Sequence, residues 1–346
     1  MNSERLRQIT DRFSEKKIAV IGDFFLDKYL EVDNSRSGIS LETGRKVHQV
    51  VNIRCSPGAA GNVVNNLAAL RAFETHAIGF IGDDGEGYDL TRQLNSLGCI
   101  TDGLLRVSDR VTPTYLKPRD MDIPGLEGEH ERYDTKNRII TSPEIEKKII
   151  EVLDSLLDKI DAVMIVDQDT EKDCGVITHT IRKHLISRAK KHPDVHFFVD
   201  SRSNAEFFQH IIIKSNRYEV MGIENPDQDT IVSSESLCRK AEQLRAKTQA
   251  SLFITLGSEG MLVFDPEEQY IRGVNIHGPV DSTGAGDSAA AGIVMALISG
   301  ATSAEAALIG NLAASVTIQQ IAVCGTCRPD ELFSRLDMWH RQGNEG

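Results

Sequence analysis

The sequence predicts a doubly wound α/β fold with a mainly parallel sheet, and three observations lead to this prediction. Helix-like and strand-like patterns alternate from residue 143 onward, which is typical of a parallel sheet covered by helices on both faces. The apolar run K-I-A-V-I-G at 17–22 ends in glycine and predicts a buried strand near the start. The 346 residues, of which 40% are hydrophobic, are enough for a single α/β domain over 1–346.

Composition excludes several classes of protein. A formal net charge of −12 argues against nucleic-acid binding and against binding to an anionic membrane surface. The N-terminal residues contain no apolar core of a signal peptide, and no run of 18 apolar residues predicts a membrane span. Six scattered cysteines suit a reducing compartment, and we interpret Cys324-Gly-Thr-Cys327 as structural. We therefore expect a cytoplasmic protein.

The strand predicted at 17–22 is followed by two carboxylates, Asp23 and Asp27. Carboxylates at the carboxyl end of a strand in an α/β sheet usually face the ligand crevice. They are good acceptors for sugar hydroxyls, so both are candidate substrate-binding residues. A solvated turn is the competing interpretation.

Two stretches outside the main alternation, about 30–54 and 104–134, predict a small β-sheet lid over the crevice. Arg119 and Arg132 in the second stretch are candidates for binding a phosphate already present on the substrate. Solvated lid charges are an equally good interpretation of these arginines. A small sheet cannot bury both of its faces alone, so we expect a homodimer formed through paired lids.

Small residues at 56–62, S-P-G-A-A-G-N, lead into a predicted helix. They allow the backbone to approach a ligand closely, and Asn62 can both donate and accept hydrogen bonds. The chain then continues with further predicted elements: helix 142–157, strand 161–166, helix 175–191, strand 195–200, a strand ending at Lys214, and strand 251–255.

The stretch from Gly278 to Gly300 carries the strongest chemical signal. Its first half, D-S-T-G-A-G-D at 281–287, is a glycine-rich turn, and a small apolar helix is predicted at 288–299. A helix N-terminus presents free N–H groups and a partial positive charge, which together bind anions and especially phosphate. Asp287 lies at this anion hole. A fixed carboxylate makes sense there as the base that deprotonates a hydroxyl attacking a phosphate.

Two other interpretations of this stretch stay open. Gly284-x-Gly286-x-x-Ala289 matches the loose dinucleotide pattern of nicotinamide-dependent dehydrogenases, although that pattern belongs at the first strand of a βαβ unit. The other interpretation is a plain loop followed by a capped helix.

The motif D-S-T-G-A-G-D-S-x-x-A-G resembles the second signature of the ribokinase-like (PfkB) carbohydrate kinases, with Ala289 in place of the usual Phe. This resemblance implies a ribokinase-like fold and catalysis by Asp287 in the turn that contains Gly284, with charge on the phosphate stabilised by the N–H groups of Ala285, Gly286 and Asp287. It also implies substrate binding by Asp27 within G-x-x-x-x-D, and by Gly58 and Asn62 within a first signature that has Pro57 and Ala59 where glycines are usual.

The resemblance further implies a nucleotide site. The motif K-x-N-x-x-E at Lys214, Asn216 and Glu219 would place Asn216 and Glu219 around Mg²⁺ and the phosphates of ATP. A helix capped by Asn216 predicts the same residues, and both interpretations can hold together. A monovalent cation such as K⁺ is a further implied cofactor. Other implied ATP contacts are Thr255, Gly257, Gly260, Thr283, Asn311 and Ser315, with a second small-residue helix expected to begin at Asn311.

The motifs G-D-x-x-L-D-x-Y, P-G-A-A-G-N and R-Y-D are most similar to the D-glycero-D-manno-heptose 7-phosphate kinase branch. That branch often carries a nucleotidyltransferase domain after the kinase, which we do not expect in these 346 residues. We expect ATP-dependent phosphoryl transfer to a hydroxyl of a sugar or sugar phosphate. The alternatives are a nucleoside kinase of the same fold and a non-catalytic sugar-binding relative. No G-x-x-x-x-G-K-[ST] motif occurs, which excludes a P-loop kinase.

Overall fold

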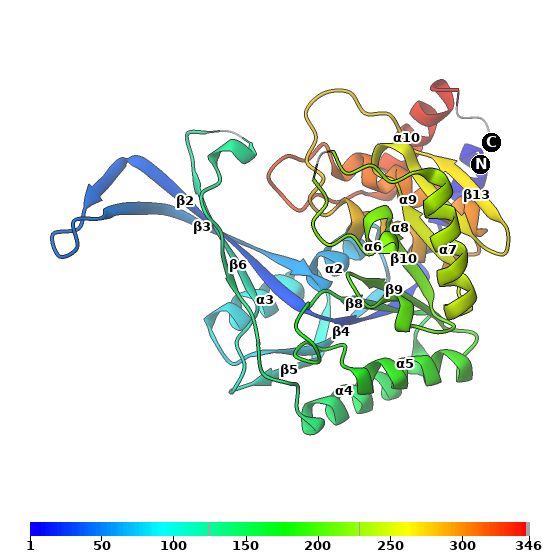
Figure 1. The fold of residues 1–346 in the computed structure, drawn as a ribbon, viewed down its shortest axis with the longest axis horizontal. Helices are drawn as coiled ribbons and strands as arrows, with labels where there is room; N and C mark the ends of the chain where they lie inside the picture. Colours follow the sequence, from blue (N-terminus) through cyan, green and yellow to red (C-terminus); the bar gives the residue numbers. More distant parts are fainter. Residues whose placement is uncertain (124, 228, 344–346) are drawn as a thin grey trace.

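The computed structural model describes residues 1–123, 125–227 and 229–343 (Figure 1). These residues contain two β-sheets and ten α-helices. The larger sheet contains β1 (Lys17–Gly22), β4 (Glu74–Gly82), β5 (Ile100–Val107), β8 (Ala162–Asp167), β9 (His196–Ser201), β10 (Ile212–Asn216), β11 (Leu252–Thr255), β12 (Gly260–Phe264) and β13 (Glu268–Arg272). The smaller sheet contains β2 (Phe24–Ile39), β3 (Lys46–Ala59), β6 (Thr114–Asp120) and β7 (Tyr133–Thr135).

The helices are α1 (Ser3–Thr10), α2 (Ala60–Ala69), α3 (Gly85–Ser96), α4 (Pro143–Leu156), α5 (His179–Lys191), α6 (Arg217–Met221), α7 (Ser234–Thr248), α8 (Ala285–Ile298), α9 (Ser303–Thr317) and α10 (Pro329–Arg341). Across the described ranges, none of them combines the length and the apolar character that crossing a bilayer requires.

The larger sheet is parallel except at one edge, and β1 lies at its topological switch point. Its order is β13-β12-β11-β10-β9-β8-β1-β4-β5, with β12 antiparallel to both of its neighbours. The chain adds β4 and β5 on one side of β1 and then continues from β8 on the other side. Ligands of such sheets bind beyond the carboxyl ends of the strands at this switch point. The predicted doubly wound α/β fold is therefore confirmed.

Side chains of β1 alternate between two hydrophobic cores, one on each face of the sheet. Ile18 and Val20 pack in the core that includes residues of α1, α2, α3, α8, α9 and α10. Ala19 and Ile21 pack in the core that includes residues of α4, α5 and α7. Because both faces are covered, the strand is apolar throughout rather than alternating, as the sequence indicated.

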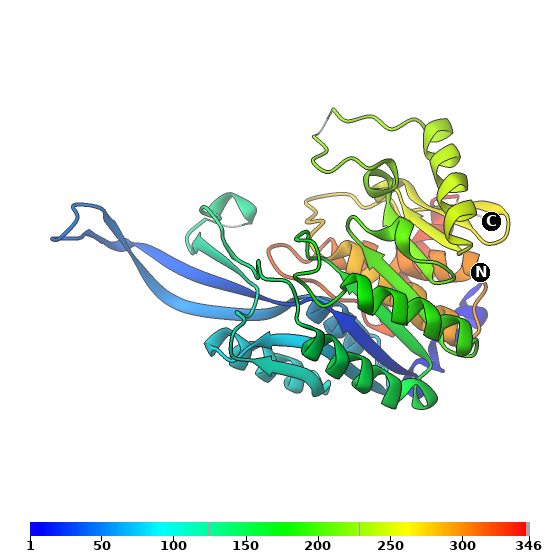
Figure 2. The same ribbon diagram turned by 60° about the horizontal axis from the view of Figure 1, so that its bottom comes forward.

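The smaller sheet forms the lid, and its β2–β3 hairpin projects far from the α/β body (Figures 1 and 2). The hairpin strands are longer than the stretch 30–54 predicted, because β2 begins at Phe24 and β3 continues to Ala59. The second predicted lid stretch, 104–134, begins too early. Residues 104–107 belong to β5 and pair with β4 in the larger sheet, while β6 and β7 lie in the lid. Residue 124 of that stretch lies outside the described residues.

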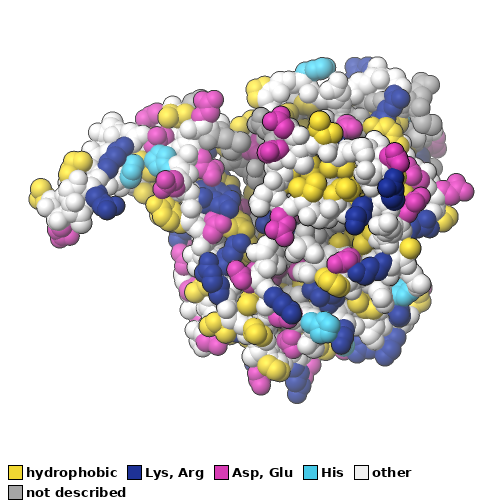
Figure 3. Space-filling model, in the orientation of Figure 1, with side chains coloured by type: hydrophobic (Ala, Val, Ile, Leu, Met, Phe, Trp, Pro, Cys, Tyr) yellow, Lys and Arg dark blue, Asp and Glu magenta, His cyan; other side chains and the backbone are white. Residues whose placement is uncertain are grey.

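Exposed apolar side chains follow the projecting hairpin (Figure 3). On β3 they are Val47, Val50, Val51 and Ile53, and Ile53 is 57% exposed. At the end of the hairpin Leu41 is fully exposed. The lid therefore leaves apolar surface uncovered in one chain, as the sequence predicted for a small sheet.

Helix caps explain where two predicted helix starts were wrong. The helix predicted at 175–191 begins at His179, because Thr178 accepts a hydrogen bond from the backbone of Ile181. The second small-residue helix begins at Ser303 rather than at Asn311. There Thr302 and Glu305 form a capping box, so Asn311 lies in the middle of α9.

Ala59 joins β3 to α2 in a backbone conformation that favours glycine, with φ 49° and ψ −118°. A residue with a Cβ atom pays about 1–3 kcal/mol for such a conformation. The conformation is imposed from both sides, since Ala59 pairs with Phe24 in the lid and the next backbone N–H, that of Ala60, donates to the carbonyl of Asp23.

We expect Ala59→Gly to raise the free energy of unfolding by about 1 kcal/mol, because relief of strain exceeds the extra entropy of glycine in the unfolded chain. Urea unfolding followed by circular dichroism measures the change. The matched control is Ala68→Gly inside α2, which should instead lower stability by about 1 kcal/mol. Equal losses for both variants would contradict the assignment of strain to Ala59.

Candidate active site

Asp287 and Asn62 come from two distant motifs and meet at the N-terminus of α8. The Nδ2 atom of Asn62 donates a hydrogen bond of 2.6 Å to Oδ2 of Asp287. Asn62 lies on α2 and is 2% exposed, whereas Asp287 is half-buried. The structure therefore brings a predicted catalytic residue and a predicted substrate-binding residue into direct contact.

The turn before α8 is shaped as an anion hole. Gly284 has φ 77°, and a Cβ atom there would lie 2.8 Å from Nδ2 of Asn62, so glycine is required for both conformation and space. The N–H of Ala285 donates to the carbonyl of Ser282, which corrects the expectation that it faces an anion. Within the described residues, the backbone N–H groups of Gly286 and Asp287 donate to no carbonyl of the turn.

A buried ammonium lies beside this turn. Nζ of Lys214 would be 3.0 Å from a Cβ atom on Gly286, so any side chain at Gly286 would displace it. Nζ forms an ion pair of 2.7 Å with Oδ2 of Asp200, and both side chains are 7% exposed. The two residues are partners in the β9–β10 register, at the carboxyl ends of their strands. Lys214, expected to bind ATP, therefore faces the anion hole.

Sequence reasoning missed Asp200 as a site residue. The signal was present, because Asp200 ends the predicted strand 195–200 in the same way that Asp23 follows the strand at 17–22. The pairing with Lys214 depends on the register between β9 and β10, which a single sequence does not reveal.

The environment of Asp287 raises the pKa of its carboxyl group. Burial is the main cause that raises the pKa of Asp287 to about 6, and the like charge of Asp200 adds to the effect. The hydrogen bond from Asn62 and the charge of Lys214 act in the opposite direction. The carboxylate is therefore mostly ionised at pH 7, yet basic enough to accept a proton.

Asn216 and Glu219, the predicted magnesium residues, form a capping box on α6. The Asn216 side chain accepts from the N–H groups of Tyr218 and Glu219, and Oε2 of Glu219 accepts from the N–H of Asn216 at 2.7 Å. Burial raises the pKa of Glu219 to about 6, against the nearby charge of Lys214. The donor set suits a hard cation at Glu219, whereas the Asn216 oxygen is already used by the helix cap.

Five of the predicted ATP contacts line one pocket beside the anion hole, with a free volume of about 300 Å³. This volume is at the lower end of small-molecule sites. Asn311 donates to the carbonyls of Ile271 and Arg272, which fixes α9 against β13 at the wall of the pocket. The five are Thr255, Gly257, Gly260, Asn311 and Ser315, joined by Ala285 and Gly286 from the turn.

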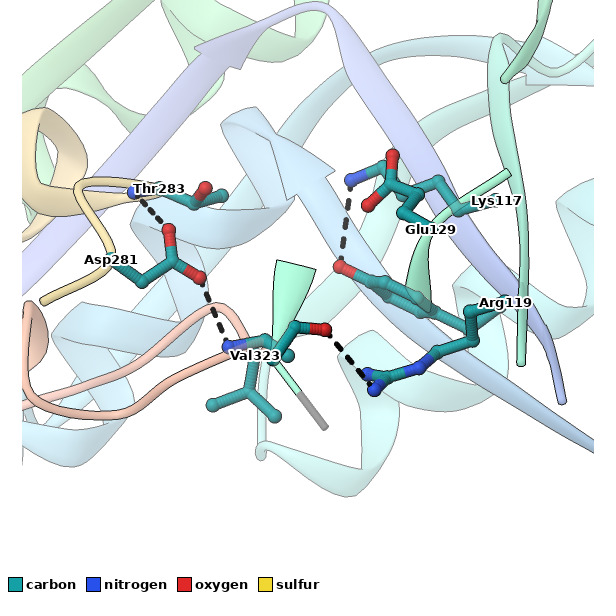
Figure 4. Close-up of a pocket in the computed structure, with 9 residues that line it drawn as sticks. Lys117, Arg119, Glu129, Asp281, Thr283 and Val323 are labelled. Atoms are coloured by element: carbon teal, nitrogen blue, oxygen red, sulfur yellow. Dashed lines mark hydrogen bonds between the residues drawn. The ribbon is translucent and has the colours of Figure 1, made fainter. Parts of the chain in front are cut away.

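Thr283 lies apart from that pocket and lines a small cavity between the lid and the body (Figure 4). Its N–H donates to Oδ1 of Asp281, and Oδ2 of Asp281 accepts from the N–H of Ala322. Asp281 thus ties the anion-hole turn to the loop before α10. Sequence reasoning did not single out Asp281, because its role depends on a loop 41 residues later in the chain.

Asp27 lies at the crevice and is held by an ion pair that the sequence did not predict. Oδ1 of Asp27 is 2.9 Å from Nζ of Lys117 on β6, and the thiol of Cys324 donates to Oδ2 at 3.6 Å. Burial is the main cause that raises the pKa of Cys324 to about 12, which keeps the thiol protonated as a donor. A Cβ atom on Gly58 would lie 2.9 Å from Oδ2, so Gly58 gives Asp27 room.

Asp23 contradicts the expectation that it binds substrate. Its Oδ2 accepts from the N–H groups of Gln168 and Asp169, and its Oδ1 accepts from the N–H of Val176. Asp23 is 4% exposed, and burial is the main cause that raises its pKa to about 7. Asp23 therefore fixes the loop after β8 rather than facing the crevice.

The two lid arginines are partly engaged with the lid itself. Arg132 forms a bidentate pair with Asp134 and lies over the ring of Tyr115 at 4.5 Å. Arg119 donates to the carbonyls of Ile123 and Gly125 and lines the cavity in Figure 4. Arg119 lines this cavity, and Arg132 covers Tyr115, which lies opposite Asp27 in the lid sheet.

Comparison with known proteins gives one consistent result. The family described as pfkB family carbohydrate kinase matches residues 15–330. The chain is 29% identical over 335 residues to the bifunctional protein HldE of Geobacter sulfurreducens, covering 94% of this chain and 64% of the relative. It is 31% identical over 326 residues to HldE of a Nitratiruptor species, covering 92% and 65%. The chain thus spans less than two thirds of the length of these relatives.

Solved structures share the fold at low sequence identity. Arabidopsis thaliana ribokinase, solved with ribose and ATP, superposes with a TM-score of 0.67 at 18% identity, covering 93% of this chain and 98% of that one. Phosphofructokinase-2 of Escherichia coli, solved with potassium, gives a TM-score of 0.70 at 17% identity, covering 93% and 99%. These likenesses confirm the ribokinase-like architecture.

Proposed function

We propose, since this chain belongs to the pfkB family of carbohydrate kinases, that it transfers the γ-phosphate of ATP to a hydroxyl of a sugar phosphate with Asp287 as the general base. The observation that carries the proposal is the position of Asp287. Its carboxylate lies at the N-terminus of α8, is held by Asn62, and has a pKa raised to about 6.

In the proposed reaction, Asp287 accepts the proton of the attacking hydroxyl. The hydroxyl oxygen attacks the γ-phosphorus, the bond from phosphorus to the bridging oxygen of ADP breaks, and ADP leaves. The N–H groups of Gly286 and Asp287 and the ammonium of Lys214 stabilise the negative charge that develops on the transferring group. Asp200 fixes the ammonium, so that it needs no reorganisation during the reaction.

Mg²⁺ would neutralise part of the charge on the ATP phosphates. Glu219 is the residue that would hold it, directly or through water, because one of its oxygens is outside the capping box and the carboxylate of Asp200 lies nearby. The pocket lined by Thr255, Asn311 and Ser315 would take the nucleoside of ATP.

A sugar phosphate is the proposed acceptor because cationic side chains of the lid face the crevice. Arg119 beside the cavity of Figure 4 and Arg132 over the ring of Tyr115 are the proposed partners of that phosphate. The motifs also resemble the branch that acts on D-glycero-D-manno-heptose 7-phosphate. A panel of hexoses, pentoses, nucleosides and their phosphates, assayed with ATP and Mg²⁺, tests this. Higher kcat/KM on unphosphorylated sugars or on nucleosides would contradict the sugar phosphate assignment.

We expect Asp287→Asn to lower kcat by roughly 10²–10⁴, because the attacking hydroxyl loses its base. Binding of ATP, measured by calorimetry, should stay within about threefold of the wild-type affinity, since the amide keeps the shape of the side chain. The matched control is Asp102→Asn, an exposed carboxylate on β5. A variant that keeps most of its kcat would exclude Asp287 as the base.

Activity should fall below about pH 6, where Asp287 becomes protonated and can no longer accept a proton. Lys214 lowers the pKa of Asp287, so Lys214→Met should move this acid limb of kcat/KM to higher pH, besides lowering the rate. Exposed Lys148→Met on α4 is the control and should leave the limb in place. A limb at unchanged pH in Lys214→Met would mean that another group controls the acid limb.

A homodimer through paired lids remains our proposal for the assembly. The exposed apolar residues of β3, at the edge of the lid sheet, would be covered by a second lid related by a two-fold axis. Such pairing buries the same patch on both subunits and removes an exposed strand edge from each.

Light scattering at micromolar concentration should give twice the chain mass of 38.2 kDa. Ile53→Lys should shift the mass toward the monomer, because a charge at a paired apolar patch is costly to desolvate. Exposed Ile231→Lys, which lies outside the lid, should leave the dimer intact. Monomer mass for the wild-type protein would exclude the dimer without affecting the proposed chemistry.

A further inference from the structure

The crevice face of the lid carries a row of polar side chains that the proposed chemistry does not use. β2 and β6 run parallel, with Tyr29 opposite Lys117 and Asp27 opposite Tyr115. Since side chains at alternate positions share a face, Asp27, Tyr29 and Lys117 all lie on the same side of the lid. Figure 4 shows Lys117 on the lid side of the cavity, with Asp281 and Thr283 of the body across from it.

Lys117 is buried to a degree that is unusual for lysine. The residue is 8% exposed, and its Nζ atom contacts Oδ1 of Asp27 at 2.9 Å and the hydroxyl of Tyr29 at 3.4 Å. A buried ion pair is often no more stabilising than apolar residues of similar volume. Stability alone therefore gives little reason for a lysine here, and its position on the crevice gives a functional one.

Both members of the pair have unused hydrogen-bonding capacity. The ammonium has three N–H donors and donates one to the hydroxyl of Tyr29, whereas its contact with Oδ1 of Asp27 is an ion pair without the alignment of a hydrogen bond. Oδ1 of Asp27 has no well-aligned hydrogen-bond partner within the described residues, although it is buried. Buried polar groups normally satisfy their hydrogen bonds. The pair is therefore incomplete without a ligand or water.

The cavity beside Lys117 limits what can complete it. About 30 Å³ is free, enough for one or two water-sized groups. A hydroxyl fits this space, whereas a phosphate group with its four oxygens does not.

We propose that Lys117 binds the acceptor sugar directly, donating a remaining N–H to the oxygen of one sugar hydroxyl while Asp27 fixes its ammonium. This inference rests on the proposed function of the crevice. It makes Lys117 a specificity-determining residue, because an acceptor that lacks this hydroxyl leaves a buried ammonium without its hydrogen bond. The lid thereby takes part in choosing the sugar.

The test separates sugar binding from mere charge balance by removing the charge of Asp27 first. In an Asp27→Asn background the ammonium no longer has an anion to balance. Adding Lys117→Met should still raise the KM of the sugar phosphate by roughly 10- to 100-fold, the loss typical of a hydrogen bond to a charged group. The KM of ATP should stay within about twofold. If the KM of the sugar phosphate in the double variant were less than twofold above that of Asp27→Asn, the proposal would be overturned.

The probe is D-glycero-D-manno-heptose 7-phosphate, or the best acceptor of the panel if that one is poor. The double variant is neutral at both positions, so it should fold, which thermal unfolding checks. Lys46→Met, an exposed lysine of the same lid, is the matched control and should leave every KM unchanged.

One further measurement distinguishes the possible contacts. If Lys117 binds a hydroxyl, the Asp27→Asn and double variants should show the same ratio of KM between the sugar phosphate and the same sugar without its phosphate. If these two KM values become similar in the double variant only, Lys117 contacts the phosphate and the hydroxyl contact is overturned. Absence of phosphorylation by the wild-type protein would instead defeat the proposed function.

Discussion

The buried ion pair between Lys214 and Asp200 is the interaction on which the site depends. It places a positive charge beside the turn at Gly286, where a Cβ atom would lie 3.0 Å from Nζ and press against it. It also modifies the pKa of Asp287, which burial mainly raises, since the charge of Asp200 raises that pKa and the charge of Lys214 lowers it. The anion hole, the base and the register of two central strands are therefore coupled, and a change in any one alters the others.

Much of the fold and half of the site followed from local patterns. The apolar run of β1 and the glycine turn before α8 predicted a strand of the sheet and a turn at a helix N-terminus, because both depend on residues close together in sequence. Asp287 and Asn62 were singled out in this way, and the structure brings them into contact. Lys117 and Asp200 were not, because their roles arise from partners on neighbouring strands, and cross-strand register is a property of the whole sheet.

Asp23 and Asp27 show the limit of local reasoning most directly. They lie four residues apart, follow the same strand and have the same chemistry. What separates them is the loop after β8, which folds back and donates three N–H groups to Asp23. The predicted boundaries of the lid were wrong for a related reason. β2 continues with a single intervening residue after β1, so no turn signal marks the change from body to lid.

This direct continuation makes the lid a lever whose pivot is Asp23. The carboxylate is fixed to the body by three hydrogen bonds, and the hairpin extends from it as far as Ile39. At roughly 3.3 Å per residue, the far end lies up to about 50 Å from the pivot, while Asp27 lies about 13 Å from it. A small tilt of the lid about Asp23 would therefore move the hairpin end several times further than it moves Asp27. Contact of the hairpin end with a second subunit would thus strongly restrain the lid residues near the crevice.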